Sequence, residues 1–274
     1  MPKNKAVILL LIILFLASAT MVSAAPKSEL WERWLAHDPG SNLIVNHSLW
    51  DSFLAAYRIQ GRNGEPSTIS YNSVDGENLQ KLESYLTYLQ SIQPSALSRV
   101  EQMAYWLNLY NARTVYLILE HYPVRSIRDI KLGGLFSSGP WDAKLLTVEN
   151  QELSLNDIEH RILRPIWQDA RIHYVVNCAS YSCPDLPARA ITALNAEQIL
   201  DEAARSYVNS ARGASLSGNR LTLSSIYNWY AEDFGDNQQH LIAHLIQYAD
   251  TDLSSRLQAY TGRIRYDYDW RLNE

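Results

Sequence analysis

Apolar residues recur at helical spacing through the first third of the chain. Residues 30–35 and residues 49–57 each carry apolar side chains that fall on one helix face. A polar loop, residues 61–66, separates the second group from a third one at residues 79–89, and Pro94 ends that segment. The first third of the chain is therefore predicted to be helical.

The longest predicted helix covers residues 99–121 and stops before Pro123, which cannot continue it. It is apolar almost all round, which is typical of a buried helix. Glu101, Asn108 and Asn111 nevertheless lie within one narrow stripe. Buried asparagines need hydrogen-bond partners. The two asparagines are candidate binding residues that line a pocket floor or orient a catalytic group; alternatively, they tie down the backbone of a glycine-rich loop.

The middle of the chain changes character. Glycines at 133–134 and 139 break the pattern, and Trp141, a candidate binding residue, follows them. Residues 144–148 and 151–155 predict a short hairpin.

Shorter elements are expected from residue 156 onward. They are a helix over 156–164 that ends before Pro165, a β-rich strand over 173–178, a helix over 196–210, a hairpin around 217–219, two C-terminal helices and a strand within 264–270. Helices and strands are segregated more than alternated, so the fold class is α+β. We expect a helical N-terminal part packed on a small mixed or antiparallel sheet.

The first residues have the order of a signal peptide. Lys3 and Lys5 precede an uncharged apolar run at residues 6–19, and small residues follow at 22–24. We expect cleavage after Ala24 and export to the periplasm or the cell exterior. The alternative is an uncleaved membrane anchor, although the apolar segment is at the lower end of the length that spans a bilayer.

Charge and length narrow the functional classes. The formal net charge is −5, and loss of the two N-terminal lysines makes it −7, with no basic cluster left. Nucleic acid is therefore not an expected partner, and a membrane is one only if the N-terminal segment stays attached. We divide the chain into a signal peptide (1–24), a helical N-terminal extension (25–89) and a domain (90–274) of the same unit. Nothing in the sequence indicates a cofactor.

Two cysteines flank a short loop directly after the predicted strand. Cys183 precedes Pro184, which predicts a helix whose N-terminus lies at Cys183 and favours its thiolate form. Cys178 lies five residues earlier and is a candidate binding residue. The alternative is a Cys178–Cys183 disulfide, which an oxidising compartment permits.

Glu159 and His160 lie in the predicted helix over 156–164. At 100° per residue, Glu159 falls on the apolar arc and His160 points toward its edge. A carboxylate on an apolar face needs a partner. Glu159 is thus either the orienting acid of a site or a structural ion pair with Arg161 or Arg164.

Together these residues suggest a Cys–His–acid set. Cys183 is the candidate nucleophile, His173 the preferred base, His160 the alternative base and Glu159 the orienting acid. Such a site would act as a hydrolase or transferase on an amide or thioester in a small molecule or peptide. The second hypothesis is a non-catalytic ligand- or protein-binding module with the disulfide. Zinc at Cys178, Cys183 and His173 lacks the Cys-x-x-Cys spacing, so no metal site is assigned.

Four ordered segments resemble the domain-of-unknown-function 547 family. They are YWLNLYNA from Tyr105, LNDIEHRILR from Leu155, HYVVNCASYSCP from His173 and YDWRLN from Tyr268. The resemblance covers about residues 90–274. It transfers no settled activity, but it implies that the four motifs belong to one unit.

Overall fold

The computed structural model describes residues 26–62, 64–132 and 139–274. The expected signal peptide and the Gly133–Gly134 break lie outside these ranges. Within them, no helix combines the length and the apolar character that crossing a membrane requires.

Helices dominate the described residues. The α-helices are α1 (Ser48–Tyr57), α2 (Gly76–Ser91), α3 (Arg99–His121), α4 (Arg164–Trp167), α5 (Ala196–Val208), α6 (Ile226–Trp229), α7 (Gln238–Tyr248) and α8 (Thr251–Gln258). Short 3₁₀ turns are η1 (Glu32–Leu35), η2 (Tyr71–Ser73), η3 (Pro94–Ala96), η4 (Ile127–Asp129), η6 (Ala170–Tyr174) and η7 (Ala231–Phe234), and η5 (Asp157–Leu163) is a π-helix. The strands are β1 (Arg58–Ile59), β2 (Thr68–Ile69), β3 (Leu146–Val148), β4 (Gln151–Leu153), β5 (Ala214–Ser217), β6 (Arg220–Ser224) and β7 (Ile264–Asp267).

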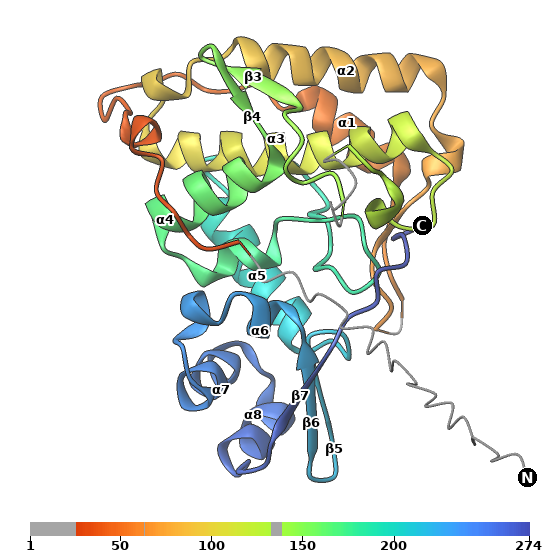
Figure 1. Ribbon diagram of the computed structural model, residues 1–274, viewed down its shortest axis with the longest axis vertical. Helices are drawn as coiled ribbons and strands as arrows, with labels where there is room; N and C mark the ends of the chain where they lie inside the picture. The colour runs from red at the N-terminus through yellow and green to blue at the C-terminus, as the bar shows by residue number, and fades with distance from the viewer. Residues whose placement is uncertain (1–25, 63, 133–138) are drawn as a thin grey trace, which may run out of the picture.

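Helix α3 is the axis of the larger hydrophobic core. In Figure 1, α2 runs along the top of the molecule above α3, and the β3–β4 hairpin lies across them. Asp75 caps α2 by accepting a hydrogen bond from the Asn78 amide. The α3 helix has the predicted bounds, and almost every side chain from its first to its fifth turn is buried. This burial matches the apolar surface that the sequence shows around the helix.

A second, smaller core lies in the C-terminal part. Strands β5 and β6 pair antiparallel, and β7 adds to β6 in parallel. These strands occupy the lower part of Figure 1 with α6, α7 and α8, and α5 lies between the two parts. The α+β class is confirmed; the mixed sheet belongs to this second core, while α2 packs on α3 and α1 packs on α2.

The predicted strand over residues 173–178 does not form. Residues 170–174 make the 3₁₀ helix η6, and residues 175–178 are irregular. The Asp169 side chain accepts a hydrogen bond from the Arg171 amide, which starts the 3₁₀ turn. The β-branched residues predicted a strand, but they are buried here without a neighbouring strand to pair with.

The helix that begins near residue 156 is π-helical and does not end before Pro165. The Arg164 amide donates to the Glu159 carbonyl, five residues back. Pro165 has no amide to offer the equivalent carbonyl of His160. The Glu29 amide binds that carbonyl instead, at 2.9 Å. The helix therefore passes Pro165 and continues to Trp167.

Two smaller expectations are also corrected. Residues 30–35 contain only the 3₁₀ turn η1, and no helix begins at Pro184. The hairpins around residues 149–150 and 218–219 form as expected.

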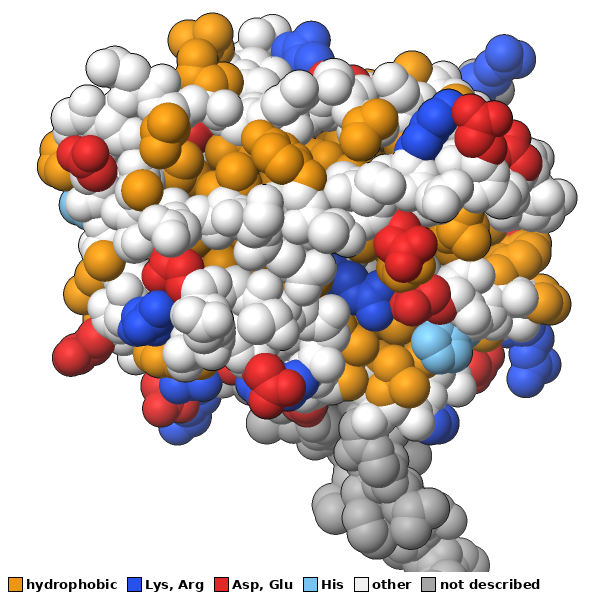
Figure 2. Space-filling model, turned by 90° about the horizontal axis from the view of Figure 1, so that it is seen from above, with side chains coloured by type: hydrophobic (Ala, Val, Ile, Leu, Met, Phe, Trp, Pro, Cys, Tyr) orange, Lys and Arg blue, Asp and Glu red, His pale blue; other side chains and the backbone are white. Residues whose placement is uncertain are grey.

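Figure 2 views the molecule from the α2 side. Apolar side chains form a broken band across this face, and basic and acidic side chains are mixed with one another around it. This face therefore presents no continuous surface of one charge sign.

Candidate functional site

The two asparagines of α3 hold the backbone of the segment that carries the cysteines. Asn111 Nδ2 donates to the Val175 carbonyl at 2.8 Å, and Asn111 Oδ1 accepts from the Asn177 amide at 2.9 Å. Asn108 makes the same two-way contact with the backbone of Ile191, at 2.6 and 3.0 Å. Both side chains act as clamps on the backbone of this segment, while the glycine-rich loop of the alternative lies outside the described residues.

We call residues 177–184 the thiol loop. Asn177 closes its base, because its Nδ2 donates to the Pro184 carbonyl at 2.7 Å and its Oδ1 accepts from the Ala179 amide at 2.8 Å. Ala179, directly after Cys178, has a left-handed backbone with φ 57°. Strained non-glycine residues of this kind persist where the surroundings hold them, often at functional sites.

The C-terminal segment runs antiparallel along the thiol loop. Tyr181 N donates to the Arg271 carbonyl at 2.7 Å, and Asn273 N donates to the Ala179 carbonyl at 3.2 Å. This pairing places the Tyr268 hydroxyl 3.2 Å from the Cys178 sulfur and 2.9 Å from Ser180 Oγ. The C-terminal motif that begins at Tyr268 thus contacts the motif that carries the two cysteines.

Both cysteines are free thiols, and their sulfurs lie 3.0 Å apart. Cys178 is half-buried, whereas Cys183 is only 4% exposed. The hydrogen bond from Cys183, aided by Ser180 and Tyr268, lowers the pKa of Cys178 to about 7 although burial opposes the change. Burial and the neighbouring Cys178 raise the pKa of Cys183 well above its ordinary value. The structure therefore favours a thiolate at Cys178, against the expectation of one at Cys183.

The helix on which the expectation for Cys183 rested does not form. Pro184 continues an irregular segment, so no helix dipole acts on Cys183. The Arg212 guanidinium donates to the Cys183 carbonyl, and the Cys178 amide donates to the Cys183 sulfur at 2.9 Å. Cys183 is therefore buried, whereas Cys178 is half-buried.

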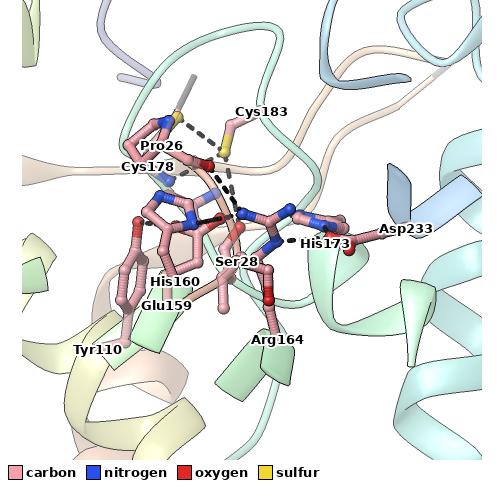
Figure 3. Close-up of polar contacts among 12 residues, drawn as sticks. Pro26, Ser28, Tyr110, Glu159, His160, Arg164, His173, Cys178, Cys183 and Asp233 are labelled. Atoms are coloured by element: carbon pink, nitrogen blue, oxygen red, sulfur yellow. Dashed lines mark hydrogen bonds and ion pairs between the residues drawn. The ribbon is translucent and has the colours of Figure 1, made fainter. Parts of the chain in front are cut away.

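A cluster of buried ionisable residues lies beside the thiol loop. We call Glu159, His160, Arg164, His173 and Asp233 the charged cluster. Figure 3 shows the two cysteines on one side of Glu159 and His160, with Arg164, His173 and Asp233 on the other. A thiolate at Cys178 raises the pKa of Glu159, so the two groups share one electrostatic environment.

Glu159 is 5% exposed, and its partner is a residue that sequence reasoning missed. The Tyr110 hydroxyl donates to Glu159 Oε2 at 2.9 Å. Burial raises the pKa of Glu159 to about 7, against the effects of Tyr110 and Arg164. The expected ion pairs of Glu159 with Arg161 or Arg164 do not form, since Arg161 pairs with Asp157 and Arg164 pairs with Asp233.

His173 is fixed by Asp233 and by a ring stack. Its Nε2 lies 2.6 Å from Asp233 Oδ2, its Nδ1 lies 3.7 Å from Glu159 Oε1, and Tyr230 stacks on it with ring centroids 4.3 Å apart. Burial lowers the pKa of His173, although Asp233 opposes this. Burial also acts against the Asp233 carboxylate, but His173 and Arg164 bring its pKa down to about 2.

His160 is buried at 3% exposure and does not point to the helix edge as expected. In a π-helix each residue turns through less than the 100° assumed for an α-helix, so both Glu159 and His160 face inward. His160 Nδ1 lies 3.0 Å from Arg164 Nη1 and 4.0 Å from Glu159 Oε1. Burial and the charge of Arg164 lower the pKa of His160 well below its ordinary value.

Arg164 joins the cluster to the N-terminal segment. It donates to Asp233 at 2.5 Å, to Glu232 at 2.7 Å and to the Pro26 carbonyl at 3.0 Å. The Ser28 amide also donates to Glu232, at 3.0 Å. The first described residues therefore lie across the charged cluster.

Trp141 is half-buried among other aromatic side chains. Its ring meets Trp270 edge-on at 5.7 Å, and Trp270 in turn contacts Trp229 and Tyr268 at 5.5 and 4.7 Å. Because Tyr268 also contacts Cys178, this aromatic group borders the thiol loop. The candidate binding residue Trp141 is thus connected to the thiols through Trp270 and Tyr268.

A cavity of about 360 Å³ lies apart from these residues. Its lining consists of Ile59, Ile69, Ser70, Tyr71, Asn72, Tyr122 and Glu274. Two of its lining residues bind Asn273, which pairs with the thiol loop: the Tyr71 hydroxyl donates to Asn273 Oδ1 and the Ile69 amide to the Asn273 carbonyl, each at 2.8 Å. Across the described residues, no group of three or more His, Cys, Asp or Glu side chains could hold a metal ion.

The structure brings together most of the residues that the sequence singled out. Cys178, Cys183, Glu159, His160 and His173 surround one region, Asn111 holds its backbone, and Asn108 lies farther along the same segment. Sequence reasoning missed Tyr110, Arg164 and Tyr268 as site residues, although each lies within a quoted motif. It also missed Asp233, for which the sequence offered no signal.

The comparisons with known proteins agree with the motifs. Residues 94–208 match the model of the family described as Protein of unknown function, DUF547. The matched span contains three of the four motifs and ends before the C-terminal one. No curated protein and no solved structure matches the chain.

Proposed function

We propose that this chain, whose residues 94–208 belong to the DUF547 family, is a thiol-dependent hydrolase or transferase with Cys178 as its nucleophile. The observation that carries the proposal is the environment of the Cys178 sulfur. It is half-buried, the Cys183 thiol and the Ser180 and Tyr268 hydroxyls lie within hydrogen-bond distance of it, and its pKa is about 7. These contacts favour the thiolate form of Cys178 over that of Cys183.

The charged cluster supplies the proton chemistry of this proposal. The Cys178 thiolate attacks the carbonyl carbon of an amide or thioester and forms an S-acyl bond. The leaving group takes a proton, and Glu159, with a pKa of about 7, is a suitable donor near neutral pH. In the second step Glu159 accepts a proton from the water or acceptor that attacks the acyl group. His173 positions Glu159 from its place between Asp233 and the carboxyl group.

The aromatic group beside the thiol loop supports a substrate with an apolar or planar portion. Trp141, Trp229 and Trp270 are half-buried, so each keeps some accessible ring surface. Aromatic surface of this kind binds flat apolar groups and peptide side chains. A small acylated molecule or a peptide fits this surface better than a highly charged polymer.

Trapping the acyl intermediate tests the proposal. Wild-type protein is incubated with an aryl thioester, and intact mass with peptide mapping locates the acyl group. We expect acylation of Cys178 that increases with pH through about 7, the pKa of its thiol. Cys178→Ser should abolish the adduct, and the matched variant Cys183→Ser should retain it. Acylation at Cys183, or no acylation of folded wild type, contradicts the proposal.

Export is a separate proposal that rests on the order of charged, apolar and small residues at the N-terminus. The mature chain would begin near Ala25, next to the segment whose Pro26 carbonyl binds Arg164. N-terminal sequencing of protein from the exported fraction should find this start. An intact Met1 on membrane-bound protein would identify an anchor instead.

A further inference from the structure

The two thiols form an asymmetric pair. Cys178 is half-buried, Cys183 is 4% exposed, and the sulfurs are 3.0 Å apart. An accessible thiol next to a buried one is the arrangement in which the first attacks an external partner and the second resolves the product. Acyl transfer uses Cys183 only as a hydrogen-bond partner of Cys178, a role that does not require a second thiol.

The path of the thiol loop brings the Cys183 side chain next to Cys178. The Cys183 amide donates to the Ser180 carbonyl at 3.0 Å, and the left-handed Ala179 reverses the chain direction. A disulfide bond is about 2.05 Å long, so the sulfurs need to approach by only about 1 Å. Asn177 and Asn111 hold only the base of the loop, so the side chains of Cys178 and Cys183 lie outside the clamped part.

We propose that Cys178 and Cys183 form a redox-active dithiol that exchanges with low-molecular-weight disulfides. The Cys178 thiolate attacks one sulfur of the disulfide RSSR, whose S–S bond breaks. RS⁻ leaves and takes up a proton, and a mixed disulfide remains on Cys178. The Cys183 thiol then loses its proton to the solvent and attacks the Cys178 sulfur, displacing the second RS⁻. The protein loses two electrons and two protons, and RSSR becomes two RSH.

The electrostatics of the pair favour this order of attack. The negative charge of Cys178 is one cause of the raised pKa of Cys183. Formation of the mixed disulfide removes that charge, so Cys183 ionises more readily once Cys178 has reacted. The Cys178 amide, 2.9 Å from the Cys183 sulfur, stabilises the thiolate that forms there.

Exchange shares Cys178 with the proposed acyl transfer but does not depend on it. A closed disulfide removes the nucleophile, so oxidation would switch acyl transfer off and a dithiol reductant would restore it. The cluster residues Glu159 and His173 take no part in the exchange steps.

Oxidation by glutathione disulfide, followed by intact mass and peptide mapping, tests the inference. We expect folded wild type to lose the mass of two hydrogens and to gain a Cys178–Cys183 bond that dithiothreitol reverses. Cys183→Ser should stop at one glutathione on Cys178, because the resolving thiol is missing. Cys178→Ser should react at least about tenfold more slowly, because the remaining thiol is buried with a raised pKa.

The outcomes separate the two proposals. A wild-type mixed disulfide that never resolves, or faster reaction of Cys183 than of Cys178, overturns the dithiol. Should the serine variants fail to fold, the order of labelling in wild type still decides, since the mixed disulfide must precede the closed one on Cys178. Reversible disulfide formation without any acylation by the thioester would leave the dithiol standing and remove the hydrolase. Acylation without disulfide closure would do the reverse.

Discussion

The thiol loop and the charged cluster are neighbours, yet different forces hold them. Neutral amides and hydroxyls fix most of the thiol loop, above all Asn111, Asn177 and Tyr268, and the Arg212 guanidinium adds a charged contact at the Cys183 carbonyl. Ion pairs fix the charged cluster, where Arg164 bridges Asp233 and Glu232. Neutral donors can stabilise a negative charge that forms on the Cys178 sulfur. In the cluster, by contrast, the acidic and basic side chains already compensate one another's charges. In the proposed reaction the loop therefore provides the nucleophile, and the cluster provides the proton donor and the electrostatic surroundings.

The largest expected effect is on the cluster's bridging cation. Arg164→Leu leaves Asp233 and Glu232 without their main partner, so we expect a loss of about 3 kcal/mol in unfolding free energy. Urea denaturation measures it. Arg161→Leu is the matched control, because the side chain of that arginine is 37% exposed and makes only peripheral contacts, with Asp157 and the Trp31 ring, so its loss should be about 1 kcal/mol. Equal midpoints for both variants would show that Arg164 is not a buried bridge.

A comparable loss is expected in the amide clamp. Asn111→Leu removes the partners of the Val175 carbonyl and the Asn177 amide, which should cost about 2–3 kcal/mol. It should also slow alkylation of Cys178 in the folded protein, because the base of the thiol loop is released. Asn108→Leu is the control: it breaks an equivalent clamp at Ile191 and should reduce stability similarly while leaving Cys178 reactivity unchanged.

The pH dependence of stability should single out Glu159. Its pKa is raised to about 7 from 4.5, so the folded state binds more protons than the unfolded state between these values. Glu159 therefore favours folding least at high pH. Relative to wild type, Glu159→Gln should gain on the order of 2–3 kcal/mol as pH rises from 4.5 to above 7. A constant difference across that range, measured by urea denaturation at each pH, would place the carboxyl in solvent.

The smallest effect concerns the Tyr268 hydroxyl, which contacts the thiol loop. Tyr268→Phe removes a donor to Cys178, and a hydrogen bond of about 1 kcal/mol corresponds to a rise of about half to one unit in the pKa of Cys178. The pH profile of Cys178 alkylation measures it. Tyr266→Phe, on the same segment but 39% exposed, should leave the profile unchanged. An unchanged profile in both would mean that Cys183 and Ser180 alone set the thiol's acidity.

The regular elements were largely predictable because their signals are local. Helix α3 has the expected bounds, since a continuous apolar surface is followed closely by Pro123. The β3–β4 turn forms at Glu149 and Asn150, both with positive φ, between two short alternating runs. Residues 173–178 had an equally strong local signal for a strand, but none of the described strands pairs with them, and Asn111 binds the Val175 carbonyl instead.

The sequence by itself determined the α+β class, the match of residues 94–208 to the DUF547 family model and the types of the candidate residues. Helical period and turn chemistry act over a few residues, and the motifs can be recognised without coordinates. Only the tertiary structure decided that Tyr110 is the partner of Glu159, that His160 is buried, and that Cys178 rather than Cys183 is the accessible thiol. Burial and partner choice depend on segments that are distant in sequence, and those two quantities set the pKa of every group in the site.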